Sequence, residues 1–600
     1  MANNNHLLPV PCYNGTMLTK DYYNDFIEFG QQKINFNFYE LALPDDDPVY
    51  TLKKVMEDLD FSGLLACYSD QGRTGYNPIM LYAVVTYANM RGVRAVDRIV
   101  DLCQRDLAFI LLTKGQKPKR DTFYDFKGKK LKGEILDGLN YQFLRRLEKE
   151  GLITLKQLYI DGTKIEANAN RYTFVWRGTL NYHLVGLLDT IDALYKKYNA
   201  LLFEYGYGAK YDLGNAQMFV AEGMDKVRKV IEENRRRKLT KNKKISNNTV
   251  IEIDNCSPLE ILKLQQNLLL IAAGEGIAFA NGKGQKKPGL QQLYEELEKC
   301  GSRLMEYKNS FEIMGKDRNS YSKTDLEATF MRMKEDHMMN GQLKAAYNVQ
   351  VAVENYFIIH GYVSNDRTDY NTLIPVLEKH RKAFGDILEE VTADSGYCSE
   401  RNLLYLKENE ITSYIKLQDH EQRKTRAYKE DIGKYHNMKY EVFEDGHYYI
   451  CHDGRELRHI RTETKEQDGY TQRYEVYGCA DCSRCEHKAK CLYKYNAEKD
   501  AEKNKVMKVN ERWEELKEET HAIIQSEKGI LNRQIRAIQT EGHFGDIKEN
   551  EKFRRYNYRS TEKVYKEFML YAIGRNINKY HRFLHDKIHK FEGKTEETAA

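Results

Sequence analysis

Residues 345–364 read AAYNVQVAVENYFIIHGYVS, and this stretch decides the fold class. Two runs rich in β-branched and aromatic residues meet at Glu354-Asn355, which predicts a β-hairpin. Residues 369–385, DYNTLIPVLEKHRKAFG, follow with the apolar spacing of an amphipathic helix, and Thr368 or Asp369 lies near its predicted N-cap.

The segments on both sides of the hairpin extend it into a sheet. Residues 387–399, ILEEVTADSGYCS, predict a strand that ends at Asp394, and a helix (400–409) and another strand (411–417) follow. Upstream, LKQLYI (155–160) predicts a strand that ends at Asp161. Because a hairpin opens this order, the pattern predicts a mixed α/β sheet and not a doubly wound parallel one.

The two strand-end aspartates suggest a metal site. Carboxylates at the ends of strands in one sheet can converge, and a pair of Mg²⁺ ions needs oxygen ligands of this kind. Glu541, in the predicted helix QIRAIQTEGHFGDIKENEKFRRY (534–556), supplies a third carboxylate, and Lys548 follows it by almost two helical turns. Taken one by one, these acidic residues are more typical of turns and caps.

Three blocks decide between these interpretations. Residues 158–178, 392–416 and 536–560 resemble the three motif blocks of bacterial insertion-sequence DDE transposases, and residues 76–109 and 322–350 resemble the same group. The resemblance runs in patches over most of residues 25–580. It implies an RNase H-like core, cleavage at transposon ends with two Mg²⁺ ions (Mn²⁺ as a substitute), and strand transfer. Asp161, Asp394 and Glu541 fall on the family's acidic positions, whereas Asp325 and Asp336 are interpreted as supporting or turn residues.

The last block departs from the family signature Tyr-x2-Arg-x3-Glu-x6-Lys. The spacing from Glu541 to Lys548 is kept, but Gln534 stands at the Tyr position and Ala537 at the Arg position. Arg536, one residue earlier, is interpreted as the substitute. The departure argues against a hairpin-intermediate mechanism that relies on this Tyr and Arg, and the pathway of excision stays open.

The predicted function is a transposase that binds the terminal inverted repeats of an insertion sequence and target DNA as a homodimer. Two alternatives stay open. One is an RNase H-like nuclease without strand transfer, and the other is an inactive, domesticated DNA-binding protein.

The domain boundaries follow changes of pattern. Residues 1–150 predict a helical, DNA-binding domain, with a break near Gly92 and a helix over 95–112. The remaining ranges are the first parts of an RNase H-like core (151–178 and 340–417), a helical insertion (179–339), a β-rich insertion with a cysteine cluster (418–510), the catalytic helix and basic part of the core (511–582), and a tail (583–600).

Basic residues beside aromatic ones indicate DNA contacts. Arg554, Arg555 and Arg559 are the preferred phosphate contacts after the catalytic helix, although a helix with a solvated basic face gives the same pattern. Lys119 and Arg120 belong to the basic segment 117–136, which by itself favours a helical packing domain. Trp176 either stacks on a displaced base or belongs to the core.

Five cysteines lie within 41 residues: Cys451, Cys479, Cys482, Cys485 and Cys491. The last four form C-x2-C-x2-C-x5-C, which predicts a structural Zn²⁺ site, with an iron–sulfur site or reduced thiols as the alternatives.

Bulk composition gives only broad limits. Hydrophobic residues make up 41% and charged residues 30%, and the net charge of +5 argues only weakly for nucleic acid. No long apolar run or secretory signal is visible, so we expect a protein inside the cell that does not enter membranes. The resemblance implies a bacterial cytoplasmic, nucleoid-associated protein.

Overall fold

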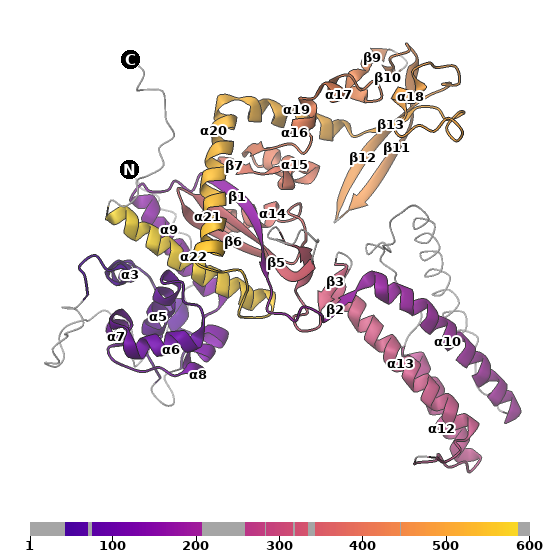
Figure 1. Ribbon diagram of the computed structural model, residues 1–600, viewed down its shortest axis with the longest axis horizontal. Helices are drawn as coiled ribbons and strands as arrows, with labels where there is room; N and C mark the ends of the chain where they lie inside the picture. Colours follow the sequence, from indigo (N-terminus) through magenta and orange to yellow (C-terminus); the bar gives the residue numbers. More distant parts are fainter. Residues whose placement is uncertain are drawn as a thin grey trace, which may run out of the picture.

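The computed structural model describes residues 43–69, 75–206, 258–282, 284–315, 318–333, 343–443, 446–467 and 469–585. Figure 1 shows four parts: an N-terminal group of helices, a central sheet, a helical arm that extends from one end of the sheet, and a separate β-rich unit. None of the helices in these ranges is both long and apolar enough to span a bilayer.

The central sheet is mixed, as the hairpin predicted. Its strand order is β4-β5-β1-β7-β8, and β6 also pairs with β5. β1 is antiparallel to β5 and parallel to β7, and β7 is parallel to β8. The strands are β1 (Gln157–Glu166), β4 (Thr329–Arg332), β5 (Leu343–Glu354), β6 (Phe357–Ser364), β7 (Glu390–Ala393) and β8 (Thr412–Ile415).

The hairpin β5–β6 turns one residue later than predicted. Asn355 and Tyr356 form the turn, with φ angles of 46° and 70°. Two consecutive positive φ values are the requirement of a type I′ turn, whose twist matches that of the flanking strands. Asn tolerates this conformation, but Tyr has no local preference for it, so the register of the strands decides its position.

Helices from distant segments cover the sheet. β6 packs against α14 (Leu373–Phe384) and α22 (Thr561–Leu584), while β8 packs against α15 (Glu400–Glu408) and α19 (Glu511–Gln525). α20 (Glu527–Arg536) follows α19 and lies on β7 and β8. Gly361 in β6 has no side chain, and a Cβ there would lie 2.6 Å from the Phe568 ring of α22. This glycine therefore permits the close approach of helix and strand.

The N-terminal helices share one hydrophobic core with the sheet. α22 packs against helices α3, α5 and α9, and all 13 residues of α5 are buried. The expected single helix over 95–112 is wrong, because Asp106 accepts hydrogen bonds from the amides of Ala108 and Phe109 and so begins a new helix. The helices are α3 (Pro48–Met56), α4 (Ser62–Leu65), α5 (Pro78–Met90), α6 (Val96–Arg105), α7 (Leu107–Thr113), α8 (Arg120–Asp125) and α9 (Gly133–Lys149).

Two parts lie outside this core. The helical arm consists of α10 (Arg177–Glu204), α12 (Pro258–Gly274) and α13 (Gly289–Met314), which pack on one another around their own apolar cluster. The β-rich unit is an antiparallel sheet in the order β13-β12-β11-β10-β9. Its strands are β9 (Lys439–Phe443), β10 (Gly446–Ile450), β11 (Glu456–Gln467), β12 (Tyr470–Cys479) and β13 (Val506–Val509).

Candidate active site

Asp161 lies inside strand β1 and does not end it, contrary to the prediction. β1 continues to Glu166 because β5 pairs with it along that whole length. The Asp161 side chain is 6% exposed, and its Oδ1 accepts a hydrogen bond from the Gly162 amide at 2.8 Å. The carboxylate is therefore held close to the backbone of its own strand.

Asp161 and Asp394 take corresponding positions on two neighbouring parallel strands. The ladder between β1 and β7 ends at the pair Ile160–Ala393, and each aspartate is the next residue of its strand. Neighbouring strands lie about 4.8 Å apart, so the register alone brings the two residues together. Asp394 directly follows β7, as predicted, and its Oδ1 accepts from the Gly396 amide at 2.7 Å.

Two groups reach Asp161, one from the last residue of α20 and one from the segment that follows it. Nη1 of Arg536, the last residue of α20, lies 3.1 Å from Asp161 Oδ2. Oγ1 of Thr540 lies 3.3 Å from the same oxygen and also donates to the Arg536 carbonyl. Among the described side chains, Arg536 Nη1 makes no hydrogen bond of ordinary geometry, so its contact with Asp161 is an ionic one.

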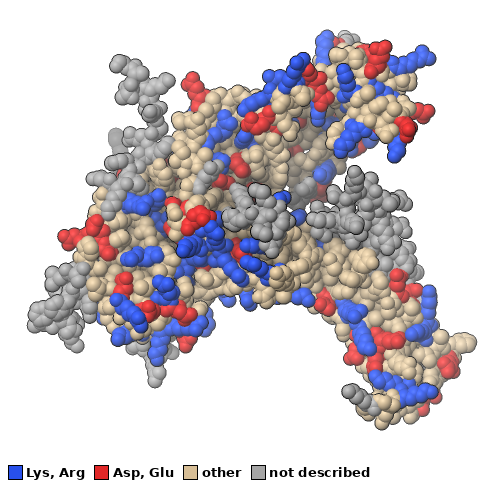
Figure 2. All heavy atoms as spheres, in the orientation of Figure 1, with Lys and Arg blue, Asp and Glu red and all other residues tan. Residues whose placement is uncertain are grey.

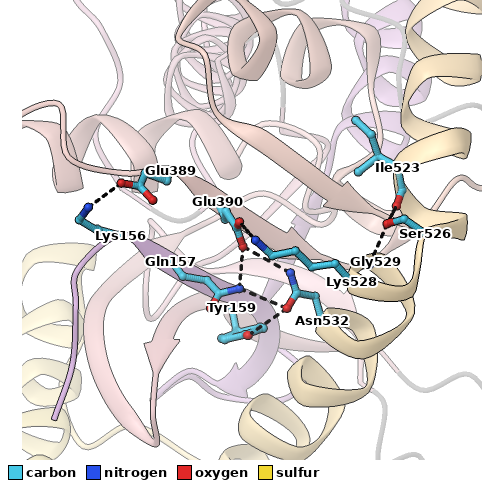
Figure 3. Close-up of polar contacts among 10 residues, drawn as sticks. All are labelled: Lys156, Gln157, Tyr159, Glu389, Glu390, Ile523, Ser526, Lys528, Gly529 and Asn532. Atoms are coloured by element: carbon cyan, nitrogen blue, oxygen red, sulfur yellow. Dashed lines mark hydrogen bonds and ion pairs between the residues drawn. The ribbon is translucent and has the colours of Figure 1, made fainter. Parts of the chain in front are cut away.

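A buried amide anchors α20 to the sheet one helical turn before Arg536. Asn532 Oδ1 accepts from Gln157 Nε2 at 3.2 Å and from the Tyr159 hydroxyl at 3.4 Å (Figure 3). Its Nδ2 donates to Glu390 of β7, which also pairs with Lys528. Since residues four apart lie on one helix face, this anchor directs Arg536 toward the site.

The segment that carries Glu541 is not a regular α-helix. Residues Ala537–Glu541 and Asp546–Asn550 form π-helical turns, η4 and η5, on either side of the short helix α21 (Gly542–Gly545). η4 packs against β1 and β5, which brings the Glu541 backbone to the strand of Asp161. The described part of the structure does not include the Glu541 side chain.

Lys548 lies in the second π-helical turn, and its side chain is 6% exposed. The expectation that Lys548 shares a face with Glu541 rests on α-helical geometry. A π-turn is wider than an α-turn. The seven-residue spacing is therefore no evidence here that Lys548 and Glu541 lie on the same face.

Asp369 belongs to the same site, although the sequence pattern assigned it to a helix cap. α14 begins later, at Leu373, and the Asp369 carboxylate accepts from the amides of Asn348 (2.7 Å) and Gln350 (2.9 Å). A Cβ at Gly162 would lie 2.8 Å from Asp369 Oδ1. The helical pattern gave no indication of this contact, because it depends on the register of β5.

The buried Tyr397 ring reports the charge of the cluster. Burial raises the pKa of the Tyr397 hydroxyl well above its ordinary value, and Asp369, Asp161 and Asp394 raise it further. The hydroxyl therefore stays protonated and donates to Gln350 Oε1.

The alternative acids differ in their surroundings. Asp325 is buried, and its two carboxylate oxygens lie 2.9 and 3.0 Å from the Tyr347 hydroxyl, which donates to them. Its Oδ1 also accepts a hydrogen bond from the Ser560 amide. Asp325 therefore links β5, which carries Tyr347, to Ser560 at the start of α22. Burial raises the pKa of its carboxyl. Asp336 lies outside the described residues.

The predicted DNA-contacting arginines gather at the far end of β1. Arg555 donates to the Ala169 carbonyl at 3.0 Å, and Arg559 donates to the Asn168 carbonyl at 2.9 Å. Arg554 is exposed and pairs with Glu549 at 2.5 Å. On the face shown in Figure 2, basic side chains gather between the N-terminal helices and the middle of the molecule.

The other two predicted basic contacts, in the N-terminal part, are exposed. Lys119 precedes α8, and Arg120 begins this helix and pairs with Asp97 at 3.2 Å. These positions leave both side chains on the surface.

Trp176 lies in a small aromatic cluster. It ends β2 (Phe174–Trp176), which pairs with β3 (Ser320–Ser322), and its ring contacts those of Phe174 and Phe330. These rings line a pocket of about 360 Å³ together with Lys344. Trp176 is therefore half-buried: it lines this pocket and also packs against the edge of the main core, to which Phe330 belongs.

The cysteines lie in the β-rich unit as free thiols. Cys479 and Cys482 are buried in its apolar cluster, and Cys451 packs against them. The Lys505 amide lies 3.4 Å from Cys482 Sγ. Burial raises the pKa of Cys479 to about 11. Cys485 and Cys491 are half-buried.

The aspartates offer hard oxygen donors to a metal, whereas the cysteines offer sulfur donors. Among the described side chains, no group of three or more His, Cys, Asp or Glu is arranged to hold a metal, and that set excludes the side chain of Glu541. At the aspartates, however, the Arg536 guanidinium stands beside Asp161 where a cation is favourable. Hard carboxylate oxygens of this kind fit Mg²⁺, which commonly takes one or two carboxylates and completes its shell with water.

Two family models match the chain. One, described as a transposase DDE domain, matches residues 450–581, and the other, described as a transposase domain (DUF772), matches residues 37–129. No curated protein matches it. The first match includes Glu541 and begins after both aspartates. Both matches are to transposase families, and together they support an insertion-element DDE transposase.

Proposed function

We propose that this transposase binds the terminal inverted repeats of an insertion sequence and catalyses Mg²⁺-dependent strand cleavage and strand transfer through Asp161, Asp394 and Glu541. The observation that carries the proposal is the register of β1 and β7, which sets the two aspartates side by side beyond Ile160 and Ala393. The Glu541 backbone follows Thr540, whose hydroxyl reaches Asp161.

We assign the central sheet to an RNase H-like core. A three-stranded antiparallel part (β6, β5, β1) continues into two parallel strands (β7, β8), and this order supports the assignment. The acidic residues lie where the antiparallel part meets the parallel part.

In the proposed mechanism, Asp161, Asp394 and Glu541 hold the metal. Two bound Mg²⁺ ions would activate a water or a terminal hydroxyl and stabilise the leaving oxygen. Thr540 keeps Asp161 in place, and Arg536 offers a positive charge at the same carboxylate. Lys548 contacts a phosphate of the DNA, since its segment joins the site to Arg554.

The DNA path follows from the exposed basic side chains. Arg555 and Arg559 lie at the end of β1, about 17 Å along the strand from Asp161, a distance that spans several base pairs of a duplex. We further propose that Lys119, Arg120 and Trp176 contact DNA, and that a homodimer pairs two transposon ends in the cytoplasm, associated with the nucleoid.

A zinc ion in the β-rich unit is a separate proposal, with Cys479, Cys482, Cys485 and Cys491 as its ligands and Cys451 beside them. The close packing of Cys451, Cys479 and Cys482, and the amide that approaches Cys482 Sγ, support it. Metal analysis of freshly purified protein tests it: one zinc per chain supports the proposal, and protein without zinc contradicts it.

The catalytic proposal is tested with labelled transposon ends and Mg²⁺. We expect wild-type protein to nick the ends and join them to target DNA, and Asp161→Asn, Asp394→Asn and Glu541→Gln to bind ends without nicking. Asp325→Asn is the matched control, a buried acid outside the site that should keep nicking.

Other outcomes contradict the proposal. Hydrolysis without joining would indicate a nuclease, and binding without hydrolysis would indicate an inactive DNA-binding protein. An active Asp161→Asn variant beside an inactive Asp325→Asn variant would show that the first acid is misassigned.

A further inference from the structure

We propose that Asp369 is a fourth carboxylate of the acidic site and that it binds a divalent ion together with Asp394. The inference rests on the proposed metal-dependent function and adds a residue that the three-acid assignment does not contain. The supporting observation is that the Asp369 carboxylate lies close to two glycines.

The two glycines lie beside the two proposed metal ligands. Gly162 follows Asp161, and a Cβ there would lie 2.8 Å from Asp369 Oδ1. Gly396 lies two residues after Asp394, and a Cβ there would lie 3.2 Å from Asp369 Oδ2 and 2.9 Å from Asp394 Oδ1. Asp369 Oδ2 and Asp394 Oδ1 therefore lie at most about 6 Å apart beside Gly396, which is close enough for two acidic groups to share a cation.

Two buried amides fix the orientation of Asp369. The side chains of Asn348 (1% exposed) and Gln350 (0% exposed) both donate to its Oδ1. Oδ2 is the oxygen that lies nearest to Gly396. Such hydrogen bonds hold a ligand in the direction of its ion and are typical of metal sites.

The carboxylate has no role in starting the following helix. α14 begins at Leu373, and the residue before it, Thr372, bonds to the backbone carbonyl of Asp369 through its amide and its hydroxyl. The side chain of Asp369 is thus turned to the sheet. Two like charges this close repel unless a cation lies between them. Two carboxylates are also enough for Mg²⁺, because water and substrate phosphate complete its shell.

Calorimetric titration of the full-length protein with Mn²⁺ tests the inference. We expect Asp369→Asn to lower the Mn²⁺ affinity at least about tenfold, the size of effect typical for groups that support a metal site. Asn keeps the oxygen that accepts from Asn348 and Gln350, so the variant should fold. Asp366→Asn is the matched control, since Asp366 lies in the same loop and accepts from Ser364; its affinity should equal that of the wild type.

Asp161→Asn and Asp394→Asn, titrated in parallel, separate the two proposals. If these two lose Mn²⁺ while Asp369→Asn binds as the wild type does, the inference is overturned and the proposed function stands. If all three bind as the wild type does, the proposed metal site itself is wrong, and the inference with it.

Thermal unfolding gives a second readout. Removing one of several neighbouring like charges should leave Tm unchanged or higher without metal, and should shrink the rise of Tm that Mn²⁺ causes. A lower Tm by the same amount with and without Mn²⁺ would show a merely structural role and overturn the inference.

Discussion

Arg536 and Asp161 form an ion pair of 3.1 Å between the end of α20 and the middle of β1, and both side chains are largely shielded from water. Without Arg536, the Asp161 carboxylate would lose its counter-charge. We expect Arg536→Gln to lower the free energy of unfolding by about 2 kcal/mol without metal, below the range for fully buried pairs because Arg536 is partly exposed. Added Mg²⁺ should recover part of this loss.

Thermal denaturation with and without Mg²⁺ measures this effect. Arg533→Gln, on the same helix, is the control and should change Tm little in either condition. An equal loss of stability in both conditions would contradict the view that metal and Arg536 neutralise the same carboxylate.

Gly574 of the C-terminal helix α22 lies directly against the backbone of the N-terminal helix α5. A Cβ there would lie 2.8 Å from the Met90 amide nitrogen and 3.0 Å from Asn89. We expect Gly574→Ala to destabilise the protein by about 1–3 kcal/mol, because the backbone of α5 cannot yield easily.

Gly138, in helix α9, offers the matched control for Gly574. Nothing lies within 4 Å of a Cβ at this position, so Gly138→Ala should raise Tm slightly through helix propensity. Melting curves of the two variants test whether Gly574→Ala lowers Tm and Gly138→Ala raises it. If both variants melt alike, the two helices do not pack as closely as described.

His360 and His380 form a buried chain of hydrogen bonds that requires the His380 ring to be neutral. His380 Nε2 must donate to the Leu155 carbonyl (2.9 Å), so its Nδ1 accepts from His360 Nε2 (2.9 Å). Burial lowers the pKa of His380 to about 4 and that of His360 well below its ordinary value.

The folded protein should therefore lose stability as the pH falls. In the unfolded chain each ring titrates at about pH 6.5. The stabilisation is thus complete above that pH and is lost as the pH falls toward the folded pKa. We expect Tm to drop between about pH 7 and pH 5, and the drop to shrink in His380→Gln but not in the exposed control His452→Gln. A Tm independent of pH in this range would contradict the buried neutral pair.

Arg555 and Arg559 should contribute to DNA binding through phosphates and not through bases. Each alanine variant should weaken binding to all sequences alike and reduce the slope of log K against log salt by about 0.9. Binding measured over a salt series tests this. Arg426→Ala, an exposed arginine of the short helix α17 (Arg426–Lys429) that pairs with Glu430, should leave the slope unchanged. A loss confined to one DNA sequence would indicate base contacts instead.

The parts of the fold that depend on local pattern were predictable from the sequence. The two runs of β-branched and aromatic residues within 345–364 predicted the hairpin, and the strand before Asp394 ends as expected. The length of β1 was not predictable, since the residues after Asp161 are polar and become a strand only through pairing with β5. The π-turns around Glu541 have no periodic signature at all.

In the acidic site, too, some residues could be predicted from the sequence and others could not. Asp161 and Asp394 stand out because they follow apolar strands, and the motif resemblance singled out Glu541. Asp369 follows the second strand of the hairpin and looks like an ordinary cap residue, because its partners Asn348 and Gln350 come from the first strand. Such a contact between segments depends on register and cannot be seen in a single sequence.

The burial of α5 against α22 has a mechanical consequence. A helix buried on all sides cannot swing on a linker, and α22 also packs on β6, so we expect the N-terminal helices and the central sheet to move as one rigid piece. DNA that touched both Arg120 and Arg559 would meet them at a spacing that the fold itself determines. The length of duplex between a recognised sequence and the cut would then be a constant of the protein, and insertions into surface loops elsewhere should not alter it.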